Sequence, residues 1–251
     1  MDIVISAATQ RSGSTMLQRI FNAREKTLIW GENGGCLTDF CRIYNNANHF
    51  AGLKHRSAYF NNGGDANKWI AGMTPPKNEV ADAMVKTVRA FHENLYVKNY
   101  SKQHDFIGYK EVRYGKKELR LLRQCYPNCT VILLVRNPID VWSSLSAKGW
   151  KELYSSLEEF TKLWNQHVET YFELSKTDSN MYLVKYEDIT SLDKETINLI
   201  KQIGHLEEQD IQKVLAKRIN SSSTSLSKVI KQFIIDQCSP LMTKMGYVDD
   251  V

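Results

Sequence analysis

The chain has 251 residues, of which 42% are hydrophobic, and its 33 basic residues exceed its 28 acidic residues to give a net charge of +5. This length suffices for one sizeable core, so we expect a single domain spanning residues 1–251. The positive charge is mild and scattered, and zinc-finger spacings and aromatic RNA-binding signatures are absent, which argues against nucleic acid as a partner. The charge suits a polyanionic ligand instead.

We expect neither a leader nor an anchor at the N-terminus, because Met1 and Asp2 run directly into an apolar stretch. No window approaches the roughly twenty apolar residues that a membrane helix needs. We therefore expect a cytoplasmic protein with no membrane anchor. The five cysteines lack Cys-x-x-Cys pairs, and the six histidines share no spacing typical of metal ligands, so we expect neither a disulfide framework nor a metal site.

In chain order, short apolar runs predict five strands, at residues 2–7, 27–30, 105–109, 130–134 and 181–184. Helical periodicity predicts the intervening helices, at residues 14–22, 78–100, 116–125, 138–147, 157–175, 194–204 and 207–218. Strands that alternate with helices indicate an α/β fold with a mostly parallel sheet and helices on both faces.

The first predicted strand runs into a turn of small residues that opens the next helix: Arg11, Ser12, Gly13, Ser14 and Thr15. Backbone N–H groups of such a turn converge on one anion, and the helix dipole adds positive potential there. The ATP-binding loop pattern is broken, since Ala8 and Ser14 stand where its first Gly and its Lys belong. We therefore expect a P-loop-type sheet whose turn binds phosphate or sulfate, with Arg11 as the cation.

A second anion site is predicted where the fourth strand ends. Arg136 follows that strand, Pro138 is well placed to open the next helix, and Ser144 comes about two helical turns after Arg136. We expect the Ser144 hydroxyl to help Arg136 hold a second phosphate. Two separated anion sites imply a ligand that is phosphorylated at both ends.

Two further charged residues follow predicted strands. Glu32 comes after the second strand and Lys110 after the third. Ligands of open parallel sheets gather outside the carboxyl ends of the strands, so these side chains should share a cleft with Arg11 and Arg136. Glu32 is our candidate for a general base, and Lys110 and Arg11 are candidates for stabilising charge that develops in a transition state.

These motifs resemble those of the sulfotransferases that use 3′-phosphoadenosine-5′-phosphosulfate (PAPS). The turn at residues 11–15 is similar to their 5′-phosphosulfate loop, and Arg136 with Ser144 is similar to their 3′-phosphate site. The likeness spans most of the chain and is closest to the tyrosylprotein sulfotransferase branch, in a bacterial-type, soluble form. It implies in-line transfer of a sulfuryl group from PAPS to a hydroxyl acceptor: a tyrosine or other phenol, a carbohydrate or a lipid.

The resemblance also implies roles for single residues. Gly31-Glu32 is similar to the pair that carries the branch's catalytic base, and Lys110 stands at the place of its catalytic lysine. Tyr186 resembles its nucleotide-contacting tyrosine, and the tail at residues 238–247 resembles its closing helix. Further donor contacts are implied for the basic residue four past Ser144 and for two members of a Ser/Thr-rich segment: Lys148, Ser223 and Lys228.

The sequence also allows other functions, another general base and several roles for one segment. An ATP-dependent P-loop kinase and a nucleotide-binding regulator without turnover are the other functions that the turn at residues 11–15 allows. Other sulfotransferase branches use a histidine base, which makes His55 the alternative to Glu32. Residues 45–76, rich in Asn and Gly and without a clean period, are a lid, an acceptor-binding insertion or a surface excursion without a role. The acceptor and the oligomeric state, a homodimer included, are not fixed.

Overall fold

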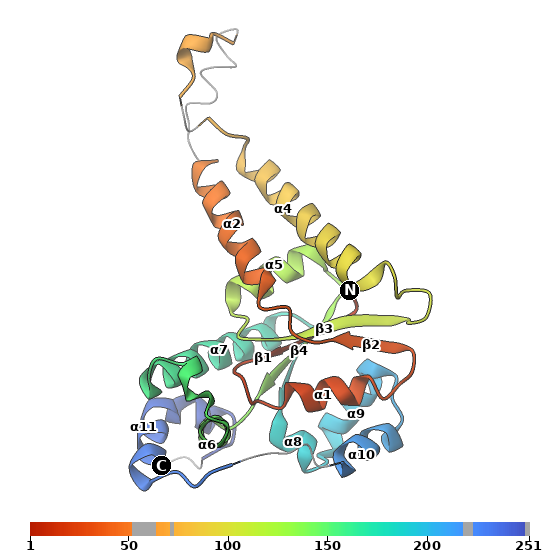
Figure 1. The fold of residues 1–251 in the computed structure, drawn as a ribbon, viewed down its shortest axis with the longest axis vertical. Helices are drawn as coiled ribbons and strands as arrows, with labels where there is room; N and C mark the ends of the chain where they lie inside the picture. The colour runs from red at the N-terminus through yellow and green to blue at the C-terminus, as the bar shows by residue number, and fades with distance from the viewer. Residues whose placement is uncertain (52–63, 71–72, 218–222, 249–251) are drawn as a thin grey trace.

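The computed structural model describes residues 1–51, 64–70, 73–217 and 223–248. Its centre is a five-stranded sheet in the order β2-β3-β1-β4-β5, in which every neighbouring pair is parallel (Figure 1). The strands are β1 (Ile3–Ala7), β2 (Thr27–Trp30), β3 (Phe106–Val112), β4 (Thr130–Val135) and β5 (Met181–Lys185). The predicted α/β class, with about five parallel strands between helices, is confirmed.

The central strand β1 is buried on both faces, because helices cover each side of the sheet. On one side, Ile3 and Ile5 pack with α1 (Ser14–Phe21), α8 (Tyr186–Thr190), α9 (Lys194–Gly204) and α10 (Glu208–Ala216). On the other side, Val4 belongs to a core formed with α2 (Cys36–Phe50), α4 (Lys77–His92), α5 (Lys116–Cys125), α6 (Pro138–Lys148), α7 (Leu157–Thr177) and α11 (Lys228–Lys244). A strand that is buried on both faces is typically a nearly continuous run of apolar residues, as β1 is.

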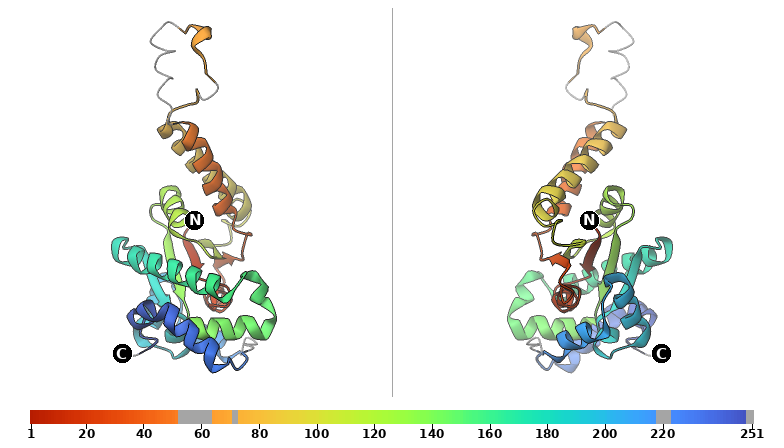
Figure 2. Two further views of the ribbon diagram at one scale, coloured as in Figure 1. Left: turned by 90° about the vertical axis from the view of Figure 1, so that its left-hand side faces the viewer. Right: turned by 90° about the vertical axis from the view of Figure 1, so that its right-hand side faces the viewer.

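Helices α2 and α4 lie side by side and project from the body that contains the sheet (Figures 1 and 2). The helix at residues 36–50 was not among the predicted elements, and its last residues fall in the segment 45–76 that has no clean period. Its apolar face is short, comprising Leu37, Phe40, Cys41 and Tyr44 at helical spacing before the Asn-rich part begins. The predicted helix at residues 78–100 ends as an α-helix at His92 and continues as a π-helical turn, Glu93–Val97.

Two other boundaries correct the sequence prediction. Strand β3 extends to Val112, so Lys110 lies inside this strand, opposite Ile5 of β1, and does not follow it. Polar residues interrupt the apolar run there, yet the strand continues because β1 supplies backbone partners as far as Val112, whereas its pairing with β2 ends at Tyr109. The expected closing helix at residues 238–247 is the second half of α11, which Ser227 caps by accepting a hydrogen bond from the Ile230 N–H at 3.3 Å, and which contains Pro240.

Candidate functional site

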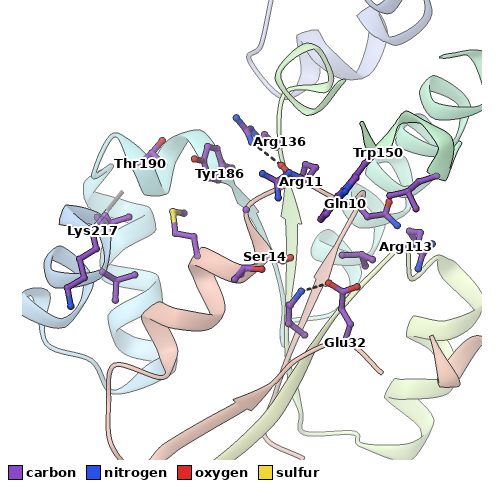
Figure 3. Close-up of a pocket in the computed structure, with 18 residues that line it drawn as sticks. Gln10, Arg11, Ser14, Glu32, Arg113, Arg136, Trp150, Tyr186, Thr190 and Lys217 are labelled. Atoms are coloured by element: carbon purple, nitrogen blue, oxygen red, sulfur yellow. Dashed lines mark hydrogen bonds and ion pairs between the residues drawn. The ribbon is translucent and has the colours of Figure 1, made fainter. Parts of the chain in front are cut away.

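A cavity of about 620 Å³ opens at the carboxyl end of the sheet (Figure 3). It lies where β1 is flanked by β3 on one side and β4 on the other, the position at which successive crossovers leave in opposite directions and ligands collect in open α/β sheets. Eight of the residues predicted from sequence line it: Arg11, Gly13, Ser14, Thr15, Glu32, Lys110, Arg136 and Tyr186.

The turn between β1 and α1 has the geometry of an anion cradle. Gly13 has φ +90°, and a Cβ there would stand 2.2 Å from a ring carbon of Tyr186, so this position needs glycine for its conformation and for the close approach. Within the described part of the chain, no hydrogen bond uses the backbone N–H groups of residues 12 to 15. These groups and the start of α1 are therefore available to bind an anion in the cavity.

Arg136 and Arg11 meet over this turn. The Arg136 Nη1 donates to the Arg11 carbonyl at 2.9 Å, and its guanidinium carbon lies 4.3 Å from the centre of the Tyr186 ring. Burial, followed by the nearby charge of Arg136, lowers the pKa of Arg11 from its usual value. Both effects disfavour the charged form of Arg11, and an anion bound beside it would offset them.

Ser144 contacts Arg11 in this structure, and its expected role beside Arg136 at a phosphate stays a prediction. Its hydroxyl accepts a hydrogen bond from the Arg11 Nε at 3.0 Å. Arg136 is held instead by Tyr186 and by the backbone of the turn, so the serine orients the first guanidinium and not the second. Both arginines nevertheless open onto one cavity, as a ligand with two anionic groups requires.

Glu32 and Lys110 form an ion pair at the other side of the turn (Figure 3). The Lys110 side chain is buried whereas the Glu32 side chain is 42% exposed, so the carboxylate remains accessible from the cavity. An accessible carboxylate beside a buried ammonium can accept a proton from a hydroxyl while the ammonium faces developing negative charge.

The backbone of the loop after Glu32 is hydrogen-bonded to Glu111, a residue that was not predicted from the sequence. Glu111 is fully buried. Its Oε2 accepts hydrogen bonds from the N–H groups of Asn33 at 3.1 Å and Gly35 at 3.0 Å, and its Oε1 accepts one from Val112 at 2.9 Å. The side chain of Asn33 in turn donates to the Tyr96 hydroxyl at 2.8 Å. This buried carboxylate therefore fixes the backbone that carries Glu32.

Five of the predicted donor-binding residues do not line the cavity: Ser12, Ser144, Lys148, Ser223 and Lys228. The buried Ser12 hydroxyl lies 2.9 Å from that of Thr9, while Lys148 is exposed near the end of α6. Ser223 and Lys228 are exposed next to residues 218–222, which are outside the described part of the chain. Contact of these five with a donor stays a prediction. His55, the alternative base, also falls outside the described residues.

Other lining residues were not predicted, among them Gln10, Arg113, Leu153, Thr190 and Lys217. Gln10 adjoins the predicted turn and would have been found by extending it by one residue. Arg113 has φ +71°, an unusual conformation for a residue with a side chain, and nothing in the sequence marks it. Trp150 lies on the cavity wall with its ring 5.3 Å from the Arg11 guanidinium carbon.

A family model described as "Sulfotransferase family" matches residues 4–210. The chain belongs to the sulfotransferase family. Solved sulfotransferases share the fold: a sulfotransferase domain from the Synechococcus PCC 7002 olefin synthase has a TM-score of 0.55 at 14% identity, covering 100% of this chain and 96% of that one. Sulfotransferase STF9 from Mycobacterium avium has a TM-score of 0.54 at 9% identity, covering 99% of this chain and 77% of that one. No curated protein sequence is similar enough to match.

Within residues 1–51, 64–70, 73–217 and 223–248, no three His, Cys, Asp or Glu side chains are grouped as metal ligands. In the same residues no helix combines the length and apolar character needed to cross a membrane.

Proposed function

We propose that this sulfotransferase uses PAPS as donor and transfers its sulfuryl group to a hydroxyl acceptor, with Glu32 as general base. One observation carries the proposal: the anion-binding turn, the two arginines and the Glu32–Lys110 pair all open onto the same cavity. Anion recognition alone would need only the turn and the arginines, whereas an accessible carboxylate in an otherwise cationic cavity suits chemistry on a group that loses a proton.

The donor fits the cationic side of the cavity. Backbone N–H groups of residues 12–15 and Arg11 suit the 5′-phosphosulfate, and Arg136 suits the 3′-phosphate of the same nucleotide. The ring of Tyr186 lies between Gly13 and Arg136, so it fixes the spacing between the two anion sites. The Walker lysine that would bind the phosphates of ATP is replaced by Ser14, which disfavours the kinase alternative.

The chemical step then follows from where the charges lie. As the acceptor oxygen attacks sulfur, its proton passes to a carboxylate oxygen of Glu32. An oxygen–sulfur bond to the acceptor forms while the bond from sulfur to the 5′-phosphate oxygen breaks, leaving a sulfate ester and 3′-phosphoadenosine-5′-phosphate. Lys110 is freed from its ion pair when Glu32 becomes neutral, and its ammonium, with Arg11, stabilises charge on the departing phosphate.

The proposal extends to the class of the acceptor. The sequence likeness to the tyrosylprotein branch makes a tyrosine or another phenol the first acceptor to test, before carbohydrates and lipids. Transfer of radiolabelled sulfuryl from PAPS across these classes identifies the preferred one.

Calorimetric titration with 3′-phosphoadenosine-5′-phosphate and with ATP tests the donor. We expect the bisphosphate to bind and ATP to bind far more weakly. Preference for ATP would support the kinase alternative, and donor binding with no transfer to any acceptor would support a regulator.

A further inference from the structure

Arg113 is a charged residue of the cavity that the proposed donor does not use. In Figure 3 it lies beside Gln10, on the opposite side of Arg11 from Arg136, Tyr186 and Lys217. The donor, as placed above, extends from the turn at residues 12–15 toward Arg136. Arg113 therefore faces the part of the cavity that remains for the acceptor.

The Arg113 guanidinium is held in place. When the Gln10 amide is oriented to satisfy both neighbours, its oxygen accepts from the Arg113 Nη1 at 3.0 Å and Nε at 3.1 Å, while its nitrogen donates to the Tyr154 hydroxyl at 2.6 Å. Burial raises the pKa of Tyr154 to about 12, so this hydroxyl stays neutral and anchors the amide. These bonds use Nη1 and Nε, and Nη2 has no hydrogen-bond partner among the described residues, so it is available to a ligand.

The backbone at Arg113 is also constrained. Its φ of +71° lies in the left-handed region, and its N–H donates to the Ala7 carbonyl at 2.8 Å, immediately beyond the paired part of β1 and β3. Non-glycine residues in this conformation are uncommon and concentrate at functional sites. The strained backbone at Arg113 therefore orients its side chain toward the cavity.

Arg113 has no acidic partner among the described residues. Among the described lining residues the cations are Arg11, Lys110, Arg113, Arg136 and Lys217, and the only carboxylate is that of Glu32. Glu32 is paired with Lys110, and no described carboxylate lies within ion-pair distance of Arg113. A fixed cation with a free donor edge inside a cavity is a binding site for an anion.

Part of the cavity wall is apolar. Trp150 and Leu153 come from the short 3-10 helix Trp150–Leu153, and both line the cavity while remaining 46% and 51% exposed. Large apolar side chains that stay this exposed at the rim of a cavity indicate a ligand that covers them.

We propose that the acceptor bears an anionic group on an apolar frame, and that Arg113 binds the anionic group while Trp150 and Leu153 pack against the frame. This inference rests on the function proposed above. It assigns a specificity role to a residue that takes no part in donor binding or proton transfer.

Two probes that differ only in charge test the proposal: para-hydroxyphenylacetate and its neutral analogue para-hydroxyphenylacetamide. Each is titrated calorimetrically into the protein saturated with 3′-phosphoadenosine-5′-phosphate. We expect the carboxylate to bind about tenfold or more tightly than the amide, as one charge-assisted hydrogen bond provides. Arg113→Leu should remove this preference, and Arg113→Lys should keep part of it. Arg19→Leu, which removes an exposed charge of α1 outside the cavity, is the matched control and should keep all of it.

The outcomes separate this inference from the proposed function. If wild-type protein binds the two probes equally, prefers the amide or binds neither, the inference is overturned; a preference that survives Arg113→Leu overturns it as well. Titration with 3′-phosphoadenosine-5′-phosphate alone is read independently, because failure of that ligand to bind contradicts the donor assignment itself. Arg113 variants should leave its affinity unchanged.

Discussion

At one side of the cavity, Arg136 and Tyr186 each follow directly on the last residue of a strand, β4 and β5. At the other side, Lys110 lies inside β3, and Glu32 stands in a loop whose shape depends on the buried Glu111. The first arrangement is local: a strand exit places the side chain. The second is tertiary, since residues far apart in the chain must pack before the carboxylate and the ammonium meet.

Each side also has a glutamate that organises its backbone. Glu111 accepts the N–H groups of Asn33 and Gly35 below Glu32. Glu187 accepts the N–H of Asn137 at 2.9 Å and the Tyr247 hydroxyl at 3.0 Å, and so ties α8 to the exit of β4 and to the C-terminal segment. The difference suggests that substitutions on the two sides affect separate quantities: turnover on the Glu32 side, and donor affinity on the Arg136 side.

Glu32→Gln is expected to separate turnover from donor affinity most strongly. Removal of the general base should lower the turnover number by about a hundred- to ten-thousandfold while the affinity for 3′-phosphoadenosine-5′-phosphate stays the same. Steady-state kinetics and calorimetry measure the two quantities. Glu25→Gln, which removes an exposed carboxylate before β2, is the control and should change neither. Full turnover in Glu32→Gln would eliminate this residue as the base and leave His55 as the candidate.

Gly13→Ala should produce the opposite pattern. A Cβ at this position collides with the Tyr186 ring and the backbone is left-handed, so the turn and the ring must move apart. We expect donor affinity to fall by about ten- to a hundredfold, corresponding to a strain of about 1–3 kcal/mol at the anion site. Gly246→Ala is matched for conformation, with φ +69° and no atom near its Cβ, and should leave donor affinity intact. Equal effects of the two variants would show that the strain is general and the contact with Tyr186 irrelevant.

The two organising glutamates give a smaller and more direct comparison. Glu111→Gln replaces one acceptor oxygen by a donor beside backbone N–H groups, so the loop that carries Glu32 shifts, and we expect turnover to fall about tenfold with donor affinity retained. Glu187→Gln should instead weaken donor binding with turnover at saturation retained. Thermal unfolding of both variants separates these effects from loss of fold. A Glu111→Gln variant that loses donor affinity alone would contradict the assignment of this carboxylate to the Glu32 side.

The same difference explains how much the sequence could predict. The strand positions and the turn around Gly13 follow from local patterns, because apolar runs, small residues and helix starts are visible within a few positions. Arg136 was found for that reason, whereas Tyr186 was found through the resemblance of its segment to a sulfotransferase motif. Glu111 and Arg113 were not, since a charged pair within and after β3 looks like the end of a strand unless its partners in other segments are known. The helix at residues 36–50 was missed because only its first half carries an apolar face.

The smallest effect is expected for a substitution of His92, a buried residue beneath the loop that carries Glu32. The ring of His92 lies 5.7 Å from that of Tyr96, whose hydroxyl holds Asn33, and neither nitrogen of His92 has a hydrogen-bond partner among the described residues. Burial, followed by the charge of the N-terminus, lowers the pKa of His92 to about 4. The unfolded chain therefore binds a proton at this residue more readily than the folded protein does.

The contribution of His92 to stability is thus complete above its unfolded pKa of about 6.5 and is lost progressively as the pH falls toward about 4. Between about pH 7.5 and about pH 6, the wild-type protein should lose about 0.8 kcal/mol more of its free energy of unfolding than His92→Phe, which keeps an aromatic ring and breaks no hydrogen bond. Urea unfolding of both proteins at the two pH values measures this difference. Identical losses would mean that His92 is hydrated or already protonated in the fold, and that the support beneath Glu32 is insensitive to pH in this range.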